Sequence, residues 1–319
     1  MKNPTRREML ELAASMAALS ALPRSSDAAQ APAVGSTLKY FPGFKAKRVT
    51  TSGAEINLVY AGSGPPLLLM HGAPQSHVSM RLIAPELAKD YTVIVPDLRG
   101  YGDSSKPADG ENHVNYSKRA MALDQVEVMK SFGFDKFAVV GHDRGGRVGH
   151  RMALDHADKI TSLAVFDIIP TYYLYTHVDI RFIQAYFHWF NNVRAAPAPE
   201  NDLKAQYEAQ QARTTDEVQL EYLRTSSDPA NIHGMCEDYR AGASIDLQHD
   251  AADLSKKIAC PLMTLWGLKG PMGRIYDVLA IWKDRGVNVS GKGLNGGHNL
   301  QEDVPAEVLA ELRPFLRPK

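Results

Sequence analysis

The chain has 319 residues, with 36 basic and 36 acidic side chains and therefore a formal net charge of zero. This length suits one large α/β domain with an insertion or two small domains. The even charge, without acidic or basic blocks, argues against a nucleic-acid partner and favours a small-molecule ligand. The two cysteines, Cys236 and Cys260, match no metal-binding spacing, so we expect two separate buried thiols, and we expect no metal or cofactor.

Residues 1–31 are predicted to be an export signal. Thr5-Arg6-Arg7-Glu8-Met9-Leu10 resembles the twin-arginine motif, and a short Ala/Leu-rich stretch follows at 12–22. That stretch is shorter than the roughly 20 apolar residues a membrane-spanning helix needs. Ala29-Gln30-Ala31 then offers a small-x-small cleavage site. We therefore expect a periplasmic protein that has no membrane span once the signal is cleaved.

From residue 45 onwards the sequence alternates predicted strands and helices. We expect strands at 46–51, 56–61, 66–70, 92–96, 137–141, 162–166, 262–266 and 287–291. Helices are expected at 76–88, 117–132, 144–155, 274–283 and 305–316. Short apolar strands alternating with helices indicate a mostly parallel, eight-stranded sheet covered on both faces.

The interval from 170 to 259 breaks this alternation because it contains no clear strand. Helices are expected there at 179–191, 203–213, 216–224 and 229–242, with a Pro/Ala linker at 195–199. We therefore predict a helical cap at 170–255, inserted after the sixth strand of a core formed by 35–169 and 256–319.

Gly141-His142-Asp143-Arg144-Gly145 has the spacing of a nucleophile elbow, G-x-S-x-G, with aspartate in place of serine. A carboxylate is a poor nucleophile toward carbonyl groups, but it can displace a leaving group from saturated carbon and form an alkyl ester. The helix N-terminus that follows favours an ionised Asp143. The motif therefore predicts opening of a carbon–halogen bond or an epoxide rather than ester hydrolysis.

Two further residues complete a nucleophile–acid–histidine order. Asp167 follows the sixth strand, where catalytic groups gather in open α/β sheets. The competing position after the next strand, within 266–270, has no acid. His298 follows the last strand, and we expect it to activate water against the ester of Asp143.

Backbone groups around the elbow are predicted to form an oxyanion hole. His71-Gly72-Ala73-Pro74 follows the third strand, and the N–H of Ala73 is one expected donor. The N–H of Arg144, directly after the nucleophile, is the other.

Arg144 and Arg147 lie on one face of the first turn after the elbow. Each positive charge there opposes the helix dipole at a cost of about 0.3–1 kcal/mol. A bidentate grip on a substrate carboxylate would explain both arginines. We therefore expect a small anionic haloacid as substrate and water as the second reactant. A homodimer is a possible assembly of the chain.

The predicted cap offers imidazole, indole and phenol donors at His188, Trp189 and Tyr239. Three donors that converge on one point can stabilise a departing halide. From the residues alone two interpretations stay open, halide binding or packing of the cap, because most aromatic residues at helical spacing serve packing.

Together these motifs resemble the fluoroacetate (haloacetate) dehalogenases of the α/β-hydrolase superfamily. The resemblance runs from about residue 45 to the C-terminus, and its segments are 71–75, 96–104, 141–147, 188–189, 236–241 and 297–298, with Asp167. It implies Asp143 as nucleophile, Asp167 as acid and His298 as histidine. It further implies that Arg144 and Arg147 bind the substrate carboxylate, and that His188, Trp189 and Tyr239 hold the halide.

Two features depart from that family. It often has an aromatic residue where Ala73 stands, which predicts a roomier pocket and tolerance of larger 2-haloacids. The export signal is the second departure, since the resemblance implies a cytoplasmic enzyme.

Two other functions stay open. An epoxide hydrolase uses the same aspartate with two cap tyrosines, for which Tyr239 and one of Tyr172, Tyr173, Tyr175 or Tyr186 are candidates. A neutral epoxide, however, leaves the two arginines nothing to bind. The other alternative is a non-catalytic periplasmic receptor on a hydrolase scaffold, which the complete set of catalytic residues disfavours.

Overall fold

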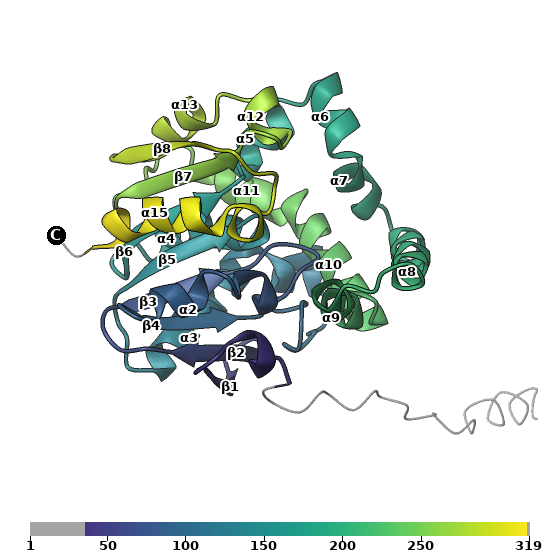
Figure 1. Cartoon of the computed structure of the whole chain (residues 1–319). Coiled ribbons are helices and arrows are strands. Elements are labelled where there is room, and N and C mark those ends of the chain that lie inside the picture. Colours follow the sequence, from purple (N-terminus) through teal and green to yellow (C-terminus); the bar gives the residue numbers. More distant parts are fainter. Residues whose placement is uncertain (1–35, 318–319) are drawn as a thin grey trace, which may run out of the picture. The chain divides into compact units, whose positions relative to one another are not determined.

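Residues 36–317 are those that the computed structural model describes, and within them eight strands form one sheet (Figure 1). The strands are β1 Lys45–Thr50, β2 Glu55–Ala61, β3 Pro66–Met70, β4 Thr92–Pro96, β5 Phe137–His142, β6 Ile160–Phe166, β7 Leu262–Gly267 and β8 Val289–Leu294. Their order is β1-β2-β4-β3-β5-β6-β7-β8. β1 and β2 are antiparallel to their neighbours, and the remaining pairs are parallel. The carboxyl ends of the parallel strands therefore meet at one edge.

The central strands are buried on both faces because their side chains alternate between two apolar clusters. Leu68 and Val139 belong to one cluster, whereas Leu67 and Val140 belong to the other. This explains why these strands are continuous apolar runs in the sequence. β8 lies at the edge of the sheet, and its side chains alternate between partly buried and exposed positions. Its sequence, VSGKGL, is therefore a weaker indication of a strand than the apolar runs of the central strands.

Helices cover both faces of the sheet. Those outside the insertion are α2 Ala84–Leu87, α3 Lys118–Ser131, α4 Arg144–Asp155, α12 Met272–Ile275, α13 Val278–Lys283, α14 Leu300–Asp303 and α15 Pro305–Leu316. Short 3₁₀ segments occur as η2 Leu38–Tyr40, η3 His77–Met80 and η4 Glu111–Tyr116. No helix in the described residues is long and apolar enough to cross a membrane.

The insertion between β6 and β7 is helical throughout. It comprises α5 Thr171–Thr176, α6 Ile180–Ala185, α7 Phe187–Asn192, α8 Ala198–Gln211, α9 Glu217–Ser226, α10 Pro229–Gly242 and α11 Ile245–Ala252. In Figure 1 the green helices α6 to α10 follow one another beside one end of the sheet. The position of this insertion, after the sixth strand, is the predicted one; the exact cap boundaries at 170 and 255 stay a prediction.

Several predicted helices are wrong in detail, and local capping explains most of the differences. The helix expected at 76–88 is divided into η3 and α2, because Ser76 caps η3 and Pro85 starts α2. The helix expected at 274–283 is divided because Asp277 accepts a hydrogen bond from Ala280 N and starts α13. The helix expected at 179–191 is divided at Tyr186. α5 and α11 were not predicted.

Two other expectations need correction. The linker at 195–199 is shorter than expected, since α8 begins at Ala198 with Pro199 in its first turn, where proline is tolerated. Both cysteines are free thiols as predicted, but only Cys236 is buried and Cys260 is partly exposed. The predicted signal at 1–31 lies outside the described residues.

Candidate active site

Asp143 occupies the sharp turn between β5 and α4. Its backbone has φ 44° and ψ −111°, a conformation that is strained for a residue with a side chain. The elbow is tight: a Cβ on Gly141 would lie 2.4 Å from the carbonyl oxygen of Gly145. Asp143 stands at the N-cap position of α4, yet its side chain makes no capping hydrogen bond. The Asp143 carboxylate therefore does not cap the helix and is available to other groups.

The Asp143 carboxylate faces a cavity of about 310 Å³ between the sheet edge and the cap. The side chain is largely buried, and burial alone would raise its pKa. The positive charges of Arg144, His298 and Arg147 outweigh burial and hold the pKa of Asp143 well below its ordinary value. The carboxylate is thus ionised at neutral pH, as predicted, although the arginines contribute to this along with the helix N-terminus.

Asp167 and His298 form a direct pair in the same cavity. Asp167 follows β6 with φ 52°, and it is completely buried. Its Oδ2 lies 2.6 Å from Nδ1 of His298, and its Oδ1 accepts a hydrogen bond from Gly267 N at 2.9 Å. Burial lowers the pKa of His298, but the hydrogen bond that Nδ1–H donates to Asp167 and the charge of Asp143 outweigh burial and raise that pKa above the ordinary value.

The loop after β3 brings a backbone donor to the nucleophile. Ala73 N donates a hydrogen bond to Oδ1 of Asp143 at 3.2 Å. The N–H of Arg144 opens α4, where first-turn N–H groups have no intrahelical acceptor. These are the two groups expected to form the oxyanion hole.

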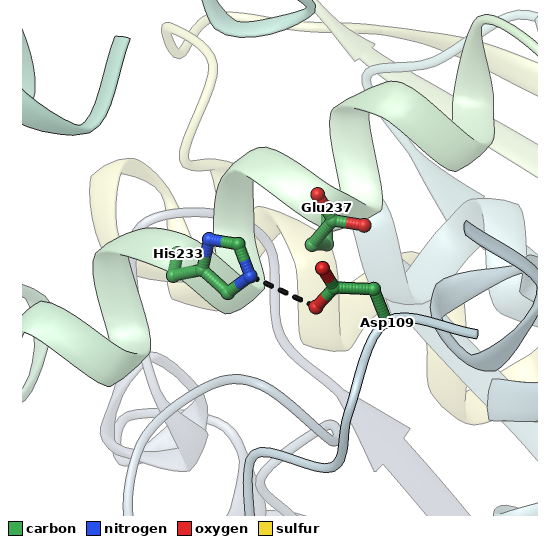
Figure 2. Close-up of side chains that lie close together, drawn as sticks. All are labelled: Asp109, His233 and Glu237. Atoms are coloured by element: carbon green, nitrogen blue, oxygen red, sulfur yellow. Dashed lines mark hydrogen bonds and ion pairs between the residues drawn. The ribbon is translucent and has the colours of Figure 1, made fainter. Parts of the chain in front are cut away.

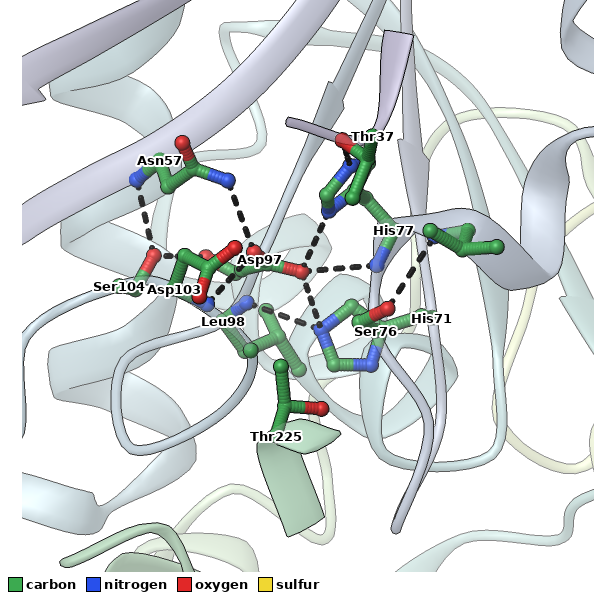
Figure 3. Close-up of polar contacts among 12 residues, drawn as sticks. Thr37, Asn57, His71, Ser76, His77, Asp97, Leu98, Asp103, Ser104 and Thr225 are labelled. Atoms are coloured by element: carbon green, nitrogen blue, oxygen red, sulfur yellow. Dashed lines mark hydrogen bonds and ion pairs between the residues drawn. The ribbon is translucent and has the colours of Figure 1, made fainter. Parts of the chain in front are cut away.

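A buried polar network, missed by the sequence reasoning, holds this loop in place (Figure 3). The carboxylate of Asp97 accepts hydrogen bonds from His77 N at 2.8 Å and from Asn57 Nδ2 at 3.0 Å, and it lies 2.8 Å from His77 Nδ1. His71 Nε2 accepts a hydrogen bond from Leu98 N at 3.0 Å. The network links β2, the loop after β4 and the segment around Ala73, so the backbone donor has little freedom to move.

Arg144 and Arg147 are both buried beside Asp143. The guanidinium carbon of Arg144 lies 3.6 Å from the ring centroid of Tyr239, and Arg147 lies 4.6 Å from that of Trp189. Nε and Nη2 of Arg144 and Nε of Arg147 have no hydrogen-bond partner among the described residues. Buried cationic donors without partners are costly, so this arrangement suits an anion that enters the cavity.

Asp238 lies beside Arg144 and balances its charge, a role that the sequence did not predict. Asp238 is completely buried and lies 3.7 Å from Arg144 Nε. It accepts a hydrogen bond from Tyr101 Oη at 2.6 Å and pairs with Lys118. Burial raises the pKa of Asp238, but Lys118 and Arg144 lower it below its ordinary value. Its charge therefore fixes the Arg144 guanidinium.

The cap contributes the opposite wall of the cavity, where the structure brings the predicted donors together. The Trp189 and Tyr239 rings meet edge to face with centroids 5.6 Å apart, and the His188 and Tyr239 rings do so at 5.9 Å. Trp189 and Tyr239 are buried, whereas His188 is exposed and lies on the rim. All three line the cavity that contains Asp143.

The cavity has further polar lining that the sequence reasoning did not place there. Tyr186 Oη and Asn192 Oδ1 are buried without a hydrogen-bond partner among the described residues. Gln206 and Gln210 reach the same cavity from α8. Tyr186 was one of four tyrosines considered for an epoxide hydrolase, and it is the one of those four that lines the cavity. The helical spacing of the aromatic residues in the sequence could not distinguish Tyr186 from the other three tyrosines.

Comparisons with known proteins agree with this fold. The sequence model of the alpha/beta hydrolase fold family matches residues 65–303. The chain is 46% identical to a fluoroacetate dehalogenase from Burkholderia sp over 288 residues, which cover 86% of this chain and 95% of that protein. It is 33% identical to a soluble epoxide hydrolase from Corynebacterium sp. (strain C12), over 84% of this chain and 95% of that protein.

A solved structure gives the same result. An alpha/beta hydrolase from Nostoc sp PCC 7120 superposes with a TM-score of 0.84 at 48% identity, covering 86% of this chain and 99% of that one. The eight-stranded sheet, the strained aspartate elbow and the matched sequence thus lead to one assignment: the chain belongs to the alpha/beta hydrolase fold family and, within it, to the family of the fluoroacetate dehalogenases.

Proposed function

We propose that the protein hydrolyses the carbon–halogen bond of small 2-haloacids, such as fluoroacetate and other haloacetates, through an ester on Asp143. The products are a 2-hydroxyacid, which is glycolate for haloacetates, and a halide ion. The observation that carries this proposal is the pair of buried arginines with unpartnered N–H groups beside an ionised carboxylate. An anionic substrate satisfies those groups, whereas a neutral one does not.

In the first step, one oxygen of Asp143 attacks the carbon next to the substrate carboxylate. That carbon's bond to the halogen breaks, and the halide leaves with the electron pair. Ala73 N donates to Oδ1, so we assign Oδ1 as the future carbonyl oxygen and the other oxygen as the attacking atom. Arg144 and Arg147 hold the substrate carboxylate, which fixes the carbon within reach.

The leaving halide is received by the cap. We assign this role to His188, Trp189 and Tyr239, whose rings contact one another on the wall of the cavity that also contains Asp143. Donated hydrogen bonds replace part of the halide's lost hydration. Fluoride needs this most, because it is the most strongly hydrated of the halides.

In the second step, His298 takes a proton from water, and the water oxygen attacks the ester carbonyl of Asp143. The N–H groups of Ala73 and Arg144 stabilise the oxyanion that forms. The hydroxyacid leaves with the oxygen that belonged to Asp143 and takes the proton from His298. Asp143 becomes a carboxylate again by releasing the second water proton to solvent. Because esterification removes the negative charge of Asp143, one cause of the raised His298 pKa disappears when His298 must act as a base.

The direct test is halide release from fluoroacetate, chloroacetate and 2-chloropropionate, with the Asp143→Asn variant as control. We expect release from at least the haloacetates and none from the control. Replacing His298 by asparagine should stop the reaction after one turnover and leave an alkyl adduct on Asp143, visible by mass spectrometry. Halide release without that adduct in the His298→Asn variant would contradict the ester scheme.

Epoxide hydrolysis is the second candidate, because Tyr186 and Tyr239 both line the cavity and Tyr186 Oη has no hydrogen-bond partner among the described residues. Two such phenols suit protonation of an epoxide oxygen. Diol formation from an epoxide, with no halide release from any haloacid, would replace the main proposal by this one.

A non-catalytic receptor on the same scaffold is tested by turnover in ¹⁸O-labelled water. Hydrolysis through the ester places solvent oxygen in Asp143 over repeated turnovers. A receptor incorporates none, so an unlabelled Asp143 after incubation with haloacid would favour the receptor.

We also propose export of the protein to the periplasm through the twin-arginine-type segment at 5–10, with cleavage near residue 31. Fractionation of cells that express the full chain should place it in the periplasm, and an Arg6→Lys/Arg7→Lys variant should stay in the cytoplasm. A homodimer is a further proposal, for which sedimentation of the purified chain is the test.

A further inference from the structure

A second polar cluster lies outside the cavity of Asp143. It borders a cavity of about 610 Å³ between the loop after β4 and helix α10, which shares no lining residue with the first cavity. Its ionisable lining residues are Asp109, His113, His233, Glu237 and Arg240. Figure 2 shows Asp109 reaching from the loop toward His233 and Glu237 on α10.

The geometry of this cluster brings imidazole and carboxylate atoms together. One ligand atom from each of Asp109, His233 and Glu237 lies within 4.8 Å of the others. His233 Nε2 is 2.8 Å from Asp109 Oδ1, and His113 Nδ1 is 2.6 Å from Glu237 Oε2. A tetrahedral metal site with bonds of about 2.0–2.2 Å needs ligand atoms roughly 3.3 Å apart. Both pair distances are shorter than that value, so each pair would have to open by roughly half an ångström or slightly more around a metal.

The backbone presents these groups in two different ways. His233 and Glu237 are one turn apart on α10 and therefore share one face of the helix. Asn112 and His113 have φ values of 51° and 61° within η4, which are strained for residues with side chains. Such strain persists where the surrounding structure fixes a side chain for a role.

The charges of the cluster also suit a divalent cation. Glu200 joins the cluster, since its Oε1 lies 2.8 Å from Arg240 Nη1 and 3.2 Å from His233 Nδ1. With neutral imidazoles, the three carboxylates of Asp109, Glu200 and Glu237 face one guanidinium, which leaves two negative charges uncompensated. Arg240 bonds Oε1 of Glu237 at 2.7 Å, so the oxygen that would face a metal is Oε2, which lies 2.6 Å from His113 Nδ1.

We propose that Asp109, His233 and Glu237, with His113 as a fourth ligand, bind a divalent transition-metal ion of the Zn²⁺ type. Two imidazoles and two carboxylates favour Zn²⁺ over Mg²⁺ or Ca²⁺, which prefer oxygen ligands alone. On binding, each neutral imidazole presents the lone pair of one ring nitrogen to the metal and keeps its proton on the other, so the metal replaces the His233–Asp109 and His113–Glu237 hydrogen bonds without net release of a proton. The proposal departs from the expectation of no metal, which rested on cysteine spacing.

The location gives the site a consequence for the fold. Asp109 and His113 come from the core loop, whereas His233 and Glu237 belong to the helix that also carries Asp238 and Tyr239. A bound metal therefore ties the core to the cap helix and adds stability without entering the cavity of Asp143. This inference does not depend on the reaction proposed above.

The experiment uses the full chain freed of metal by a chelator, with Zn²⁺ as the probe. At a free Zn²⁺ concentration 100 times the Kd, we expect the melting temperature to rise by about 5 °C or more. One equivalent of Zn²⁺ should remain per chain after desalting, and Co²⁺ should give the visible absorption of a four-coordinate site. Asp109→Asn and His233→Gln should each remove the tightly held equivalent.

Two control variants keep the result specific. His156→Gln changes a histidine outside the cluster and should retain the wild-type response. His298→Asn removes the catalytic histidine and should also retain it, which excludes binding beside Asp143. Asp109 is on a partly exposed loop, so its amide variant tests the site even if His233→Gln does not fold. Absence of a retained equivalent in the wild type, or equal retention in Asp109→Asn, would overturn the proposal.

Discussion

The two sides of the Asp143 cavity differ in how their polar groups are satisfied. We call the side formed by the strand-end loops, with Asp143, Asp167, His298 and Ala73, the floor. The side formed by the cap, with Tyr186, His188, Trp189 and Tyr239, is the wall. On the floor the Asp167–His298 pair and the Ala73–Asp143 contact are in place. On the wall Tyr186 Oη has no partner among the described residues.

This difference suggests a division of tasks: the floor carries out the bond-breaking steps, and the wall selects the substrate. The floor is held by strained turns at Asp143 and Asp167 and by the buried Asp97 network, so its geometry is fixed before a substrate arrives. The wall contains the edge contacts of Tyr239 with His188 and Trp189, and beside them Tyr186 Oη has no hydrogen-bond partner among the described residues. We therefore expect changes to Asp143, Asp167 and His298 on the floor to reduce turnover most, and changes to Ala73 or to the wall to alter which molecules react.

The largest effect should follow from removing the nucleophile on the floor. Asp143→Asn keeps the shape of the side chain but loses the negative charge, and we expect halide release to fall by at least about 10⁴-fold. Circular dichroism should show an unchanged fold. A variant with more than a hundredth of wild-type activity would mean that the floor does not act through Asp143.

The next effect concerns the base on the floor and depends on pH. The pKa of His298 is raised above its usual value in the free enzyme, and the ester removes the Asp143 charge that contributes to it, so the acid limb of alkyl-enzyme hydrolysis should lie below the His298 pKa of the free enzyme. Asp167→Asn removes a charge that raises this pKa, so the remaining activity should be about 10²–10⁴-fold lower, with its acid limb at lower pH. Single-turnover rates measured across pH provide the test, and an unmoved limb would argue against the pair.

A smaller effect is expected where the floor meets the substrate carboxylate. Arg144→Lys keeps the charge but loses the planar pair of donors, which should lower kcat/KM for haloacetates by about 10–100-fold. The matched control is Arg119→Lys on α3, where an exposed arginine pairs with Asp155. Equal losses in the two variants would indicate a general effect on stability.

The wall should discriminate between the two candidate reactions. Tyr239→Phe removes a donor assigned to the halide and should slow fluoroacetate turnover by about 10-fold, since a hydrogen bond to a charged group is worth about 1.5–3 kcal/mol. Tyr186→Phe should have less effect on the haloacid reaction. Comparable losses in both variants, with epoxide as substrate, would favour epoxide hydrolysis.

The smallest effect should come from the rim beside Ala73, which is half-buried and lines the cavity. Ala73→Phe fills part of the space, and we expect the rate on 2-chloropropionate relative to chloroacetate to fall several-fold. The ratio of the two kcat/KM values is the measurement. An unchanged ratio in an enzyme that accepts both substrates would show that Ala73 does not set substrate size.

The sequence predicted the floor better than the wall. Asp143 was identified by its glycine-flanked turn, and Asp167 and His298 by their positions after strands. These signals are local, because each residue directly follows a strand whose apolar run is recognisable. The wall was inferred from residue type and from the family resemblance: His188, Trp189 and Tyr239 were named. Tyr186 was not distinguished from three neighbouring tyrosines, since only packing decides which ring faces the cavity.

The amino-acid sequence by itself determined the parallel sheet, the helical insertion and the positions of Asp143, Asp167 and His298 directly after strands, because hydrophobic periodicity and glycine turns can be recognised along the chain. The tertiary structure alone decided which groups support the site from a distance. Asp238 lies 3.7 Å from Arg144 although 94 residues separate them, and Asp109 lies 2.8 Å from His233 across 124 residues. Such pairs cannot be recognised from sequence periodicity, since their contact depends on how the cap helix α10 packs against the core.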